Sequence, residues 1–574
     1  QGLIPILGAF IVQQITKIVE NILKTKTEIH LEAIMPLIYV VIGYTILTIL
    51  FISVGKYILS KLHPFYFAKR NTLLLNNFKK FTTMEYGLYE DSTFQDAIGF
   101  WSRALESNMT GYQGILTKSI TLAGDFVGLA LLFILLSTVS IQIVIIAIIS
   151  MIAYTLIEIK LSEFQRSKLE EDQKITRPLN TLKDICADFK YGKDVRVFEM
   201  QDAFKSLFNK LIKERDDFLY SLFKYRLKFQ LPSAIALSIT FLAGLYFLGL
   251  GYMNNDIDGP KFLMMIMALT LAINISTKFS QDLAFVFGEF IYLEDFYDWI
   301  DADVNPSGGM NCPEEIDCTI KFEDVWFRYP GSEEWVLQNV NFTIPNKSSL
   351  ALVGVNGAGK TTIIKLLTGL YQAEKGRITI GGIDISRINP TELSKIFGVV
   401  FQEINPVAMT IAENISASSG EIDEDKIRNV LNQVGLLEKI ESYPLGIHTP
   451  LLRTLEEDGI ILSGGENQKL MIARALYKDT SKILILDEPT AALDALAEEE
   501  IYKSFNELLQ GRTAIFISHR LASTRFCNKI ALLNGGKMEE EGTHEELLKR
   551  GELYCKMYET QASYYREGEN HEKW

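Results

Sequence analysis

The strongest chemical signature in the chain is a short glycine-rich stretch that ends in lysine and threonine. It fits the pattern G-x-x-x-x-G-K-[ST], which is typical of loops that bind phosphate. Its glycines let backbone N–H groups converge on one concavity, where they can bind an anion. The lysine can reach the β- and γ-phosphates of a nucleotide, and the threonine hydroxyl can ligate Mg²⁺. The residues are Gly354, Val355, Asn356, Gly357, Ala358, Gly359, Lys360 and Thr361.

The segments on either side of this stretch predict the strand–loop–helix context that the pattern requires. Residues 349–353, Ser-Leu-Ala-Leu-Val, are short and apolar, as expected of a buried strand. Residues 362–367, Thr-Ile-Ile-Lys-Leu-Leu, are typical of the first turns of a helix. The N-terminus of that helix would add positive potential. A chance glycine-rich turn is the alternative, and these flanking segments disfavour it.

Two adjacent acids follow another apolar run. Residues 482–486, Lys-Ile-Leu-Ile-Leu, predict a buried strand, and Asp487 and Glu488 come directly after it. In a parallel sheet, the carboxyl ends of the strands face the ligand crevice. One acid can therefore hold Mg²⁺ through water, and the other can polarise the water that attacks a phosphate. An acidic strand-to-turn transition is the alternative, but the presence of a phosphate loop in the same domain weighs against it.

Two further features point to phosphate chemistry. The apolar run of residues 513–518 ends at His519, and a histidine at a strand end can contact a γ-phosphate, although a lone histidine is more often structural. Ser463, Gly464 and Gly465 open a predicted helix, whose N-terminus would be another anion-binding site. One chain would then carry two separate phosphate-binding helix ends. Such an arrangement suits two copies of the chain with nucleotide between them.

Length, composition and charge place these motifs in a protein with two unlike halves. At 574 residues the chain is too long for one hydrophobic core. Long apolar runs alternate with charged stretches up to about residue 300, and beyond it the apolar runs are short. The net charge of −14 argues against a nucleic-acid surface. The six histidines show no zinc-binding spacing and the five cysteines form no C-x-x-C, so free reduced thiols are expected.

The first half predicts a membrane domain, because about twenty apolar residues span a bilayer and such runs recur. Residues 2–12 are apolar but short, so we expect the outer part of a span that begins before Gln1, with residues 13–34 carrying its helix beyond the bilayer. No cleavable signal peptide is visible. Buried core helices of a soluble protein are the disfavoured alternative. Further spans are predicted at residues 35–59, 126–139, 141–157, 234–253 and 262–275.

Two charged connectors, residues 60–118 and 160–229, separate the spans. They are rich in lysine and arginine, which places them on the cytoplasmic side. They lack linker composition, so we expect long helices that leave the membrane, turn and return. At 1.5 Å per residue, a helical arm of about thirty residues would project roughly 45 Å. The tips are expected near residues 89–94 and 191–198, where they could dock onto a soluble domain.

Two features of this half admit two interpretations each. Asp125 and Lys278 lie near span ends, so they either face a cavity, as intramembrane charges usually do, or sit at the membrane interface. An aromatic stripe after the last span could be a ligand box, but packing between helices is the favoured interpretation. Its residues are Phe285, Phe287, Phe290, Tyr292, Phe296, Tyr297 and Trp299.

The order of these motifs resembles that of a known family. The soluble half is similar to an ABC (ATP-binding cassette) nucleotide-binding domain, and nearly the whole chain resembles a half-size ABC exporter. The resemblance implies a six-helix α-helical membrane bundle followed by an α/β P-loop ABC nucleotide-binding domain, with ATP and Mg²⁺ as cofactors. The expected domains are a transmembrane domain with cytoplasmic helical extensions at residues 1–303, a linker at 304–317 and the nucleotide-binding domain at 318–574.

The resemblance implies roles for individual residues around the phosphate loop. Tyr329, which follows a predicted strand at residues 320–327, looks like the aromatic residue that stacks on adenine. Residues 354–361 resemble the Walker A loop, and Thr362 beside it would contact the α-phosphate. Gln402 is similar to the Q-loop glutamine, a contact of Mg²⁺ and water.

The remaining motifs of the resemblance lie further along the chain. Residues 463–465 match the signature motif, which caps the γ-phosphate held by the partner subunit. Asp487 and Glu488 match the Walker B aspartate and the catalytic base, and Asp494 resembles the D-loop aspartate. His519 resembles the switch histidine.

One position departs from the family pattern. Glu466 follows Ser-Gly-Gly where the family usually has glutamine. Because the serine and the helix N-terminus are intact, we expect function to survive. The connector tips resemble the coupling helices of exporters, and in that family the second tip docks onto the partner's nucleotide domain. The resemblance therefore implies an intertwined dimer.

The function implied is ATP-driven export of an amphipathic small molecule or peptide across the cytoplasmic membrane, by alternating access, with ATP hydrolysed at a dimer interface. The expected partners are a second half-transporter (a homodimer by default, or a heterodimer), the lipid bilayer and the cargo, with no nucleic acid. The alternatives are a lipid or lipid-linked glycan flippase, an importer built on the exporter fold, a soluble ABC protein acting on nucleic acid, and a nucleotide-gated channel or regulator.

Overall fold

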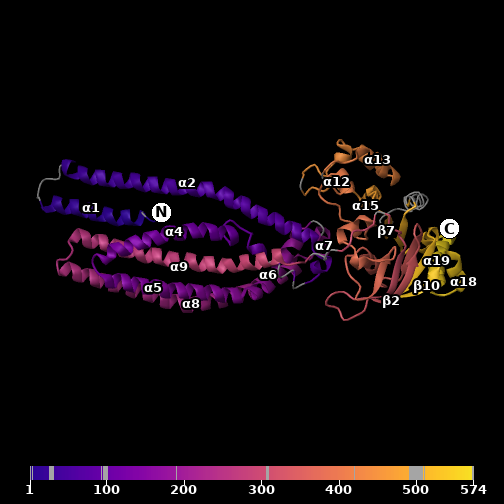
Figure 1. Cartoon of the computed structure of the whole chain (residues 1–574), viewed down its shortest axis with the longest axis horizontal. Coiled ribbons are helices and arrows are strands. Elements are labelled where there is room, and N and C mark those ends of the chain that lie inside the picture. The colour runs from indigo at the N-terminus through magenta and orange to yellow at the C-terminus, as the bar shows by residue number, and fades with distance from the viewer. Residues whose placement is uncertain are drawn as a thin grey trace. The chain divides into compact units, whose positions relative to one another are not determined.

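The computed structural model divides the chain into two compact units, which Figure 1 colours along the sequence. The helical unit comprises Gln1–Thr83 and Ser92–Ala302, and the α/β unit comprises Met84–Asp91 and Asp303–Trp574. The short segment 84–91 therefore belongs to the α/β unit although it follows a helix of the other unit. The structure describes residues 2, 4–24, 31–91, 94, 98, 101–188, 191–304, 309–313, 315–418, 420–454, 456–489, 509 and 511–571.

Within the described residues, six helices are long and apolar enough to cross a membrane. The first of them, α1, is a candidate span from Ile4 to Lys24, so the apolar part of the first span is longer than the predicted residues 2–12. Apolar residues continue in its second half between the polar ones, and the helix ends at Lys24 instead of extending through residue 34. The six helices are α1 (Ile4–Lys24), α2 (Leu31–Thr83), α4 (Gly111–Ser137), α5 (Ile141–Ser167), α8 (Gln201–Met253) and α9 (Gly259–Asp301).

The connectors form the long helical arms that the sequence predicts. Helices α2 and α8 each contain 53 residues, which corresponds to about 80 Å at 1.5 Å per residue. The short 3₁₀ helix η1 (Tyr86–Tyr89) follows α2, and the short helix α7 (Gly192–Val197) lies between α6 (Leu169–Ala187) and α8. These two short helices lie at the predicted tips, although part of the first tip falls outside the described residues.

One apolar cluster joins helices α1, α4, α5, α8 and α9 within the helical unit. Leu132 of α4, Leu248 of α8 and Leu269 of α9 are fully buried in one cluster with Ala9 of α1. Gly244 allows α8 to approach α9 closely, because a Cβ there would lie 2.5 Å from the Leu269 side chain. Helix α9 starts where Asp258 accepts a hydrogen bond from the Lys261 N–H at 2.9 Å, which satisfies one of the free donors of a helix start.

The polar and aromatic residues flagged in this unit have defined contacts. Lys278 of α9 forms an ion pair with Asp125 of α4, so the two charges compensate each other. The packing interpretation of the aromatic stripe holds for its buried members, because Phe296 and Trp299 are almost fully buried. Trp299 stacks on Trp101 with ring centroids 4.3 Å apart. Phe287 and Phe290 are instead exposed.

Two sheets form the α/β unit. A four-stranded sheet has the order β2-β1-β4-β5, and a six-stranded sheet has the order β10-β9-β3-β8-β7-β6, in which the five strands from β9 to β6 are parallel and β10 is antiparallel to β9. The strands expected from the sequence are present. Their bounds are β1 (Ile320–Phe327), β2 (Leu337–Ile344), β3 (Ser349–Gly354), β4 (Lys375–Ile380), β5 (Ile383–Asp384), β6 (Phe397–Val400), β7 (Ile483–Asp487), β8 (Thr513–Ile517), β9 (Lys529–Asn534) and β10 (Lys537–Gly542).

The central strands β3, β7 and β8 are buried along their whole length, as parallel strands covered on both faces should be. The order of the strands brings the carboxyl ends of these three to one edge, where the motifs follow them. Among its described residues, this unit contains the helices α10 (Lys360–Leu367), α11 (Pro390–Lys395), α12 (Ile411–Ser416), α13 (Glu424–Gln433), α14 (Leu437–Glu441), α15 (Gly464–Tyr477), α18 (His544–Arg550) and α19 (Leu553–His571), with short 3₁₀ turns η3 (Ile385–Arg387), η4 (Gly446–His448) and η5 (Leu521–Phe526).

Candidate nucleotide-binding site

The phosphate loop connects the buried strand β3 to helix α10 through two glycines that no other residue could replace without strain. Gly354 has φ of 153°, and a Cβ there would lie 2.1 Å from the Leu533 carbonyl oxygen. Gly359, the residue before α10, has φ of 100°, and a Cβ there would lie 2.6 Å from the Leu337 side chain. The left-handed backbone turns successive N–H groups towards the start of the helix.

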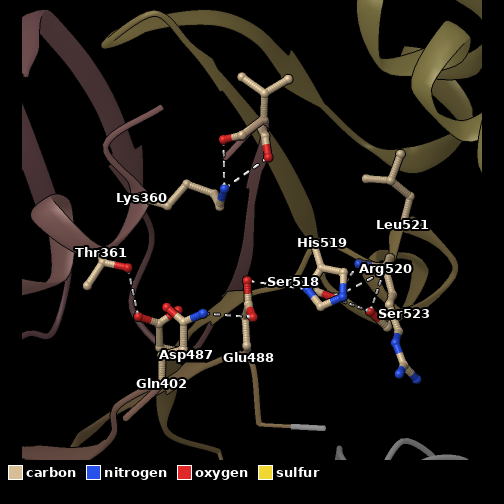
Figure 2. Close-up of polar contacts among 12 residues, drawn as sticks. Lys360, Thr361, Gln402, Asp487, Glu488, Ser518, His519, Arg520, Leu521 and Ser523 are labelled. Carbon is tan, nitrogen blue, oxygen red and sulfur yellow. Dashed lines mark hydrogen bonds and ion pairs between the residues drawn. The ribbon is translucent and has the colours of Figure 1, made fainter. Parts of the chain in front are cut away.

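Lys360 and Thr361 are held in place by short contacts at this loop (Figure 2). The Lys360 ammonium donates to the carbonyl oxygens of Gly354 at 2.9 Å and Val355 at 3.0 Å, so it lies along the loop. The Thr361 hydroxyl donates to Asp487 Oδ2 at 3.0 Å, which joins the phosphate loop to the end of β7. Two residues that the sequence places 126 positions apart therefore present their oxygens side by side.

Glu488 lies at the centre of a second group of polar contacts. Its carboxylate accepts a hydrogen bond from Gln402 Nε2 at 3.2 Å and lies 3.3 Å from His519 Nδ1 (Figure 2). Its backbone has φ of 51°, which is uncommon for a residue with a side chain and costs about 1–3 kcal/mol. Its N–H donates to the Ile517 carbonyl at 3.0 Å, and its carbonyl accepts from Gln468 Nε2 at 2.8 Å, so hydrogen bonds on both sides hold this conformation.

Burial shifts the protonation equilibria of the two charged groups beside the loop. Burial raises the pKa of Asp487 to about 6, and the neighbouring charge of Glu488 adds to the rise, while the Thr361 hydrogen bond and the charge of Lys360 oppose it. Burial also lowers the pKa of Lys360, against the opposing influence of Glu488 and Asp487. Asp487 and Lys360 are both buried, and a poorly solvated site strengthens any charge interaction made there.

Tyr329 follows β1 and reaches the same helix. Its hydroxyl lies 3.0 Å from the Thr362 hydroxyl, so the tyrosine ring is placed beside the start of α10. Its ring packs edge-to-face against Phe327 and Tyr371, with centroids 5.1 and 5.4 Å away. The structure therefore brings together Tyr329, Thr362, Gln402, His519, Asp487, Glu488 and the phosphate loop.

The signature segment is built differently. Ser463 precedes α15, its hydroxyl accepts from the Glu466 N–H at 3.3 Å, and the Glu466 carboxylate accepts from the Ser463 N–H at 2.8 Å. This is a reciprocal capping box, and Lys439 lies 3.6 Å from Glu466. Burial opposes ionisation of Glu466, but the hydrogen bonds from Ser463 and the charge of Lys439 outweigh it, so its pKa lies below the ordinary value.

Two of the predicted site features do not join this cluster. Within the part of the chain that the structure describes, neither a hydrogen bond nor an ion pair links residues 463–465 to the phosphate loop. Asp494 lies outside the described residues, so its assignment stays a prediction. In the described chain no group of three acids, histidines or cysteines has the geometry of a metal site. Thr361 of the loop and Asp487 at the end of β7 place two oxygen donors 3.0 Å apart.

Two residues that position the site were not found from the sequence. Gln468 bonds the Glu488 carbonyl, and Gln561 donates to the His519 carbonyl at 2.6 Å while accepting from the Leu521 N–H at 2.9 Å. Gln561 lies 42 residues after His519, and nothing in the sequence between them indicates the contact. Gln468 lies five residues after Ser463, so its place on the signature helix was the one available signal.

The helical unit contains a cavity of about 990 Å³ between α4, α5, α6, α8 and α9. Side chains of both charges line it together with aromatic rings, among them Glu158, Arg166, Arg226, Phe285 and Phe290. Glu158 is 8% exposed, and its Oε1 is buried without a hydrogen-bond partner. An unpaired buried carboxylate oxygen is costly, so a donor from a ligand would be favoured there.

Fold and site together define a class of protein: a membrane bundle of six long helices joined to an α/β domain with a phosphate loop. Residues 337–491 match the family model described as ABC transporter. The whole fold is also that of a solved bacterial Atm1-family ABC exporter with ATP bound, which superposes with a TM-score of 0.78 at 21% identity over 98% of this chain and 97% of that one.

Two relatives that are named as transport proteins each match less than half of the chain. A glutathione/L-cysteine transport system ATP-binding/permease protein of Bacillus subtilis is 38% identical over 242 residues, which cover 42% of this chain and 41% of that protein. An ATP-dependent lipid A-core flippase of Alkalilimnicola ehrlichii is 35% identical over 269 residues, covering 47% and 45%. The chain thus spans less than half the length of these two relatives. It contains an ABC transporter nucleotide-binding domain and has the fold of a half-size ABC exporter.

Proposed function

We propose that the α/β unit binds and hydrolyses ATP, and the observation that carries this is the contact of Glu488 with Gln402 and His519 beside the phosphate loop. In this proposal the loop N–H groups and Lys360 bind the β- and γ-phosphates, Thr362 contacts the α-phosphate, and Tyr329 stacks on adenine. Glu488 acts as general base towards the attacking water, which Gln402 and His519 orient. General base catalysis of this kind contributes about 10²–10⁴-fold to rate.

The oxygen donors at this site are of the kind that Mg²⁺ prefers. The Thr361 hydroxyl and the Asp487 carboxylate lie together, and hard oxygen donors of this type suit Mg²⁺, which also keeps bound waters. When bound, Mg²⁺ would neutralise charge on the β- and γ-phosphates. The residues of this chain keep Asp487 in place through Thr361, and its raised pKa means that a proton competes for the same carboxylate below about pH 6.

We further propose that the chain is one half of an exporter in the cytoplasmic membrane. The separation of the signature residues 463–465 from the phosphate loop supports a site completed by a second copy, whose signature residues would cap the γ-phosphate. A homodimer is the simplest such arrangement. ATP must then bind the closed dimer more tightly than the open one, because only a difference in affinity can shift the equilibrium between conformations.

The cavity of the helical unit supports an amphipathic small molecule or peptide as cargo. Glu158 would accept a hydrogen bond from an ammonium group, Arg166 and Arg226 would pair with carboxylates, and Phe285 and Phe290 would contact apolar parts. Small zwitterionic compounds combine these groups. One relative is named for transport of glutathione and L-cysteine, which belong to this class.

A lipid flippase is the second candidate, since another relative carries that name. The two candidates differ in where the cargo would bind. A zwitterionic cargo would depend on Glu158, whereas a flipped lipid would depend on the apolar faces of the spans and would be indifferent to the loss of one buried carboxylate.

The test is a set of measurements on the full chain, in lipid nanodiscs for ATP turnover and in proteoliposomes for transport. ATP turnover and uptake of labelled glutathione or L-cysteine into inverted proteoliposomes are measured for the parent, Glu488→Gln and Glu158→Gln. We expect Glu488→Gln to bind ATP without turnover, and Glu158→Gln to keep basal turnover and lose uptake. Turnover of Glu488→Gln at the parental rate would refute the catalytic assignment. Uptake of neither compound, together with movement of labelled lipid between leaflets, would favour the flippase.

A further inference from the structure

The segment that follows helix α2, residues 84–91, packs against the rest of the α/β unit near the phosphate loop. Residues 84–91 belong to the α/β unit, and within that unit the Glu85 N–H donates to the Val304 carbonyl at 3.0 Å. The 3₁₀ helix η1 then places Tyr86 and Glu90 against the side chains of α10 and the loop after it. A segment bound in this way can influence the residues that it touches.

Glu90 is the polar end of this contact. Its carboxylate accepts a hydrogen bond from the Tyr371 hydroxyl and pairs with the Lys365 ammonium at 3.4 Å. Tyr371 is 5% exposed and belongs to the core of the α/β unit. Burial, together with the hydrogen bond to Glu90 and its charge, raises the pKa of Tyr371, so the hydroxyl keeps its proton and remains the donor.

Lys365 is surrounded by aromatic rings. Its ammonium lies 5.2 Å from the ring centroid of Tyr329, 5.5 Å from that of Tyr371 and 5.8 Å from that of Tyr86. An ammonium within about 6 Å of a ring centroid is attracted by the electron-rich ring face. Although burial works against the charge, Tyr329 and Glu90 outweigh it, so the pKa of Lys365 lies above its ordinary value and the attraction persists at neutral pH.

The aromatic rings themselves form a fixed frame. Tyr329 and Tyr371 meet at 90° with centroids 5.4 Å apart, and Tyr86 and Tyr371 meet at 84° with centroids 5.8 Å apart. Edge-to-face pairs of this kind are favoured by the charge distribution of the rings. An open cavity of about 500 Å³ lies beside Tyr329, and Glu85 lines it together with Tyr371 and Gln372. Segment 84–91 therefore supplies one wall of the space next to the tyrosine ring.

We infer that segment 84–91 is part of the adenine-binding site, and that Glu90 and Lys365 are positioning residues that hold the Tyr329 ring for the base. Glu90 fixes the Lys365 ammonium, and Lys365 in turn fixes the ring of Tyr329 beside the cavity. This inference rests on the proposed stacking of adenine on Tyr329.

The experiment measures ATPase kinetics of the full chain in nanodiscs for Tyr329→Ala, Lys365→Met and Glu90→Gln. We expect KM for ATP to rise about tenfold in the first and about three- to fivefold in the other two, with kcat within twofold of the parent. UTP, whose smaller base stacks less well, should be affected less than ATP. Lys365→Arg keeps a cation over the rings and should restore KM.

Matched controls remove similar contacts elsewhere in the same unit. Lys375→Met removes an ammonium that lies over the rings of Trp326 and Trp335, and Glu323→Gln removes the partner of Arg377. Both should leave KM for ATP unchanged. Thermal unfolding of every variant shows whether the fold is intact, and a variant that fails to fold is replaced by the milder Tyr371→Phe, which loses one hydrogen bond to Glu90 and should raise KM about twofold.

Combining substitutions separates this inference from the proposal on which it rests. If Tyr329→Ala leaves KM for ATP unchanged, the stacking proposal itself is refuted. If Tyr329→Ala raises KM while Lys365→Met and Glu90→Gln do not, the positioning role is overturned and the stacking role stands. In the Tyr329→Ala background, Lys365→Met should add nothing further, because residues that act through one another are not additive. A full additional increase would overturn the inference.

Discussion

The two helix N-termini to which the sequence assigns phosphate binding are built in opposite ways. Helix α10 begins after Gly359 and has no side-chain cap, so its first N–H groups are available to an anion. Helix α15 begins after Ser463 with a complete capping box, so the N–H groups of Ser463 and Glu466 are already bonded within the chain. An anion at α10 meets no side-chain cap, whereas one at α15 that takes the Ser463 hydroxyl as a donor must compete with the capping box.

The side chains near the starts of α10 and α15 also differ. Lys360, Thr361, Asp487 and Glu488 meet at α10 within a single chain. At α15 the nearby charge is the carboxylate of Glu466, paired with Lys439. We expect α10 to determine nucleotide affinity and chemistry, and α15 to contribute only when a second chain supplies the phosphate. Substitutions at each end test this division.

The largest effect is expected at the start of α10, which has no side-chain cap, from the substitution Gly359→Ala. The added Cβ would lie 2.6 Å from the Leu337 side chain at a φ of 100°, so the loop must change shape. We expect affinity for ATP to fall more than 100-fold and the melting temperature of the α/β unit to drop, measured by equilibrium binding and by thermal unfolding. Gly535→Ala, also at positive φ but with open space around its Cβ, is the control for the backbone effect alone. Equal losses in both variants would contradict the special role of the loop.

Asp487→Asn, beside the start of α10, should raise the stability of the α/β unit and abolish ATP turnover. The pKa of Asp487 is about 6 in the folded chain against an ordinary 3.8, so the folded state holds its proton more tightly. The free energy of unfolding therefore falls as pH rises through this window, and the full cost of about 3 kcal/mol is present at pH 7. Without Mg²⁺, the variant should be more stable than the parent at pH 7, should lose this advantage near pH 4, and should not turn over ATP.

Thermal unfolding of the α/β unit in the full chain, followed from pH 4 to pH 8, measures this difference. Asp479→Asn is the control, because Asp479 pairs with Lys426 at the surface and should change stability by less than about 1 kcal/mol. A variant that is less stable than its parent at pH 7 would show that the ionised carboxylate is stabilised by its neighbours, and the raised pKa would be wrong.

The phosphate loop at the start of α10 was predictable because each of its motifs is a run of consecutive residues. The buried strands β3, β7 and β8, the loop between β3 and α10 and the start of α15 all follow from short patterns. The apolar part of the first span was predicted too short because α1 alternates polar and apolar residues in its second half, so a count of consecutive apolar residues stopped at residue 12. The contact of Glu90 with Tyr371 spans 281 residues, and no local pattern indicates it.

A smaller effect is expected at the start of α15, which has the capping box, from the substitution Ser463→Ala. Loss of the hydroxyl removes one capping hydrogen bond, which costs about 1 kcal/mol of stability. Turnover should fall about tenfold, because the proposed cap on the partner's γ-phosphate is lost, while binding of ATP to its own loop should stay within twofold. Turnover at saturating ATP and equilibrium binding distinguish the two effects. A large loss of binding would mean that α15 shapes the loop of its own chain, against the division proposed here.

The smallest effect is expected from Glu466→Gln, which restores the residue usual at this position. Glutamine can also accept a hydrogen bond from the Ser463 N–H, so the capping box survives. The negative charge disappears, which weakens a favourable interaction with the helix N-terminus by about 0.3–1 kcal/mol and removes repulsion of an incoming phosphate. Stability should therefore fall slightly while KM for ATP falls about twofold, and Glu545→Gln, at the start of α18, is the control for loss of charge at a helix end. A several-fold loss of turnover would instead assign the carboxylate a positive role in the composite site, and the two helix ends would then differ in chemistry as well as in capping.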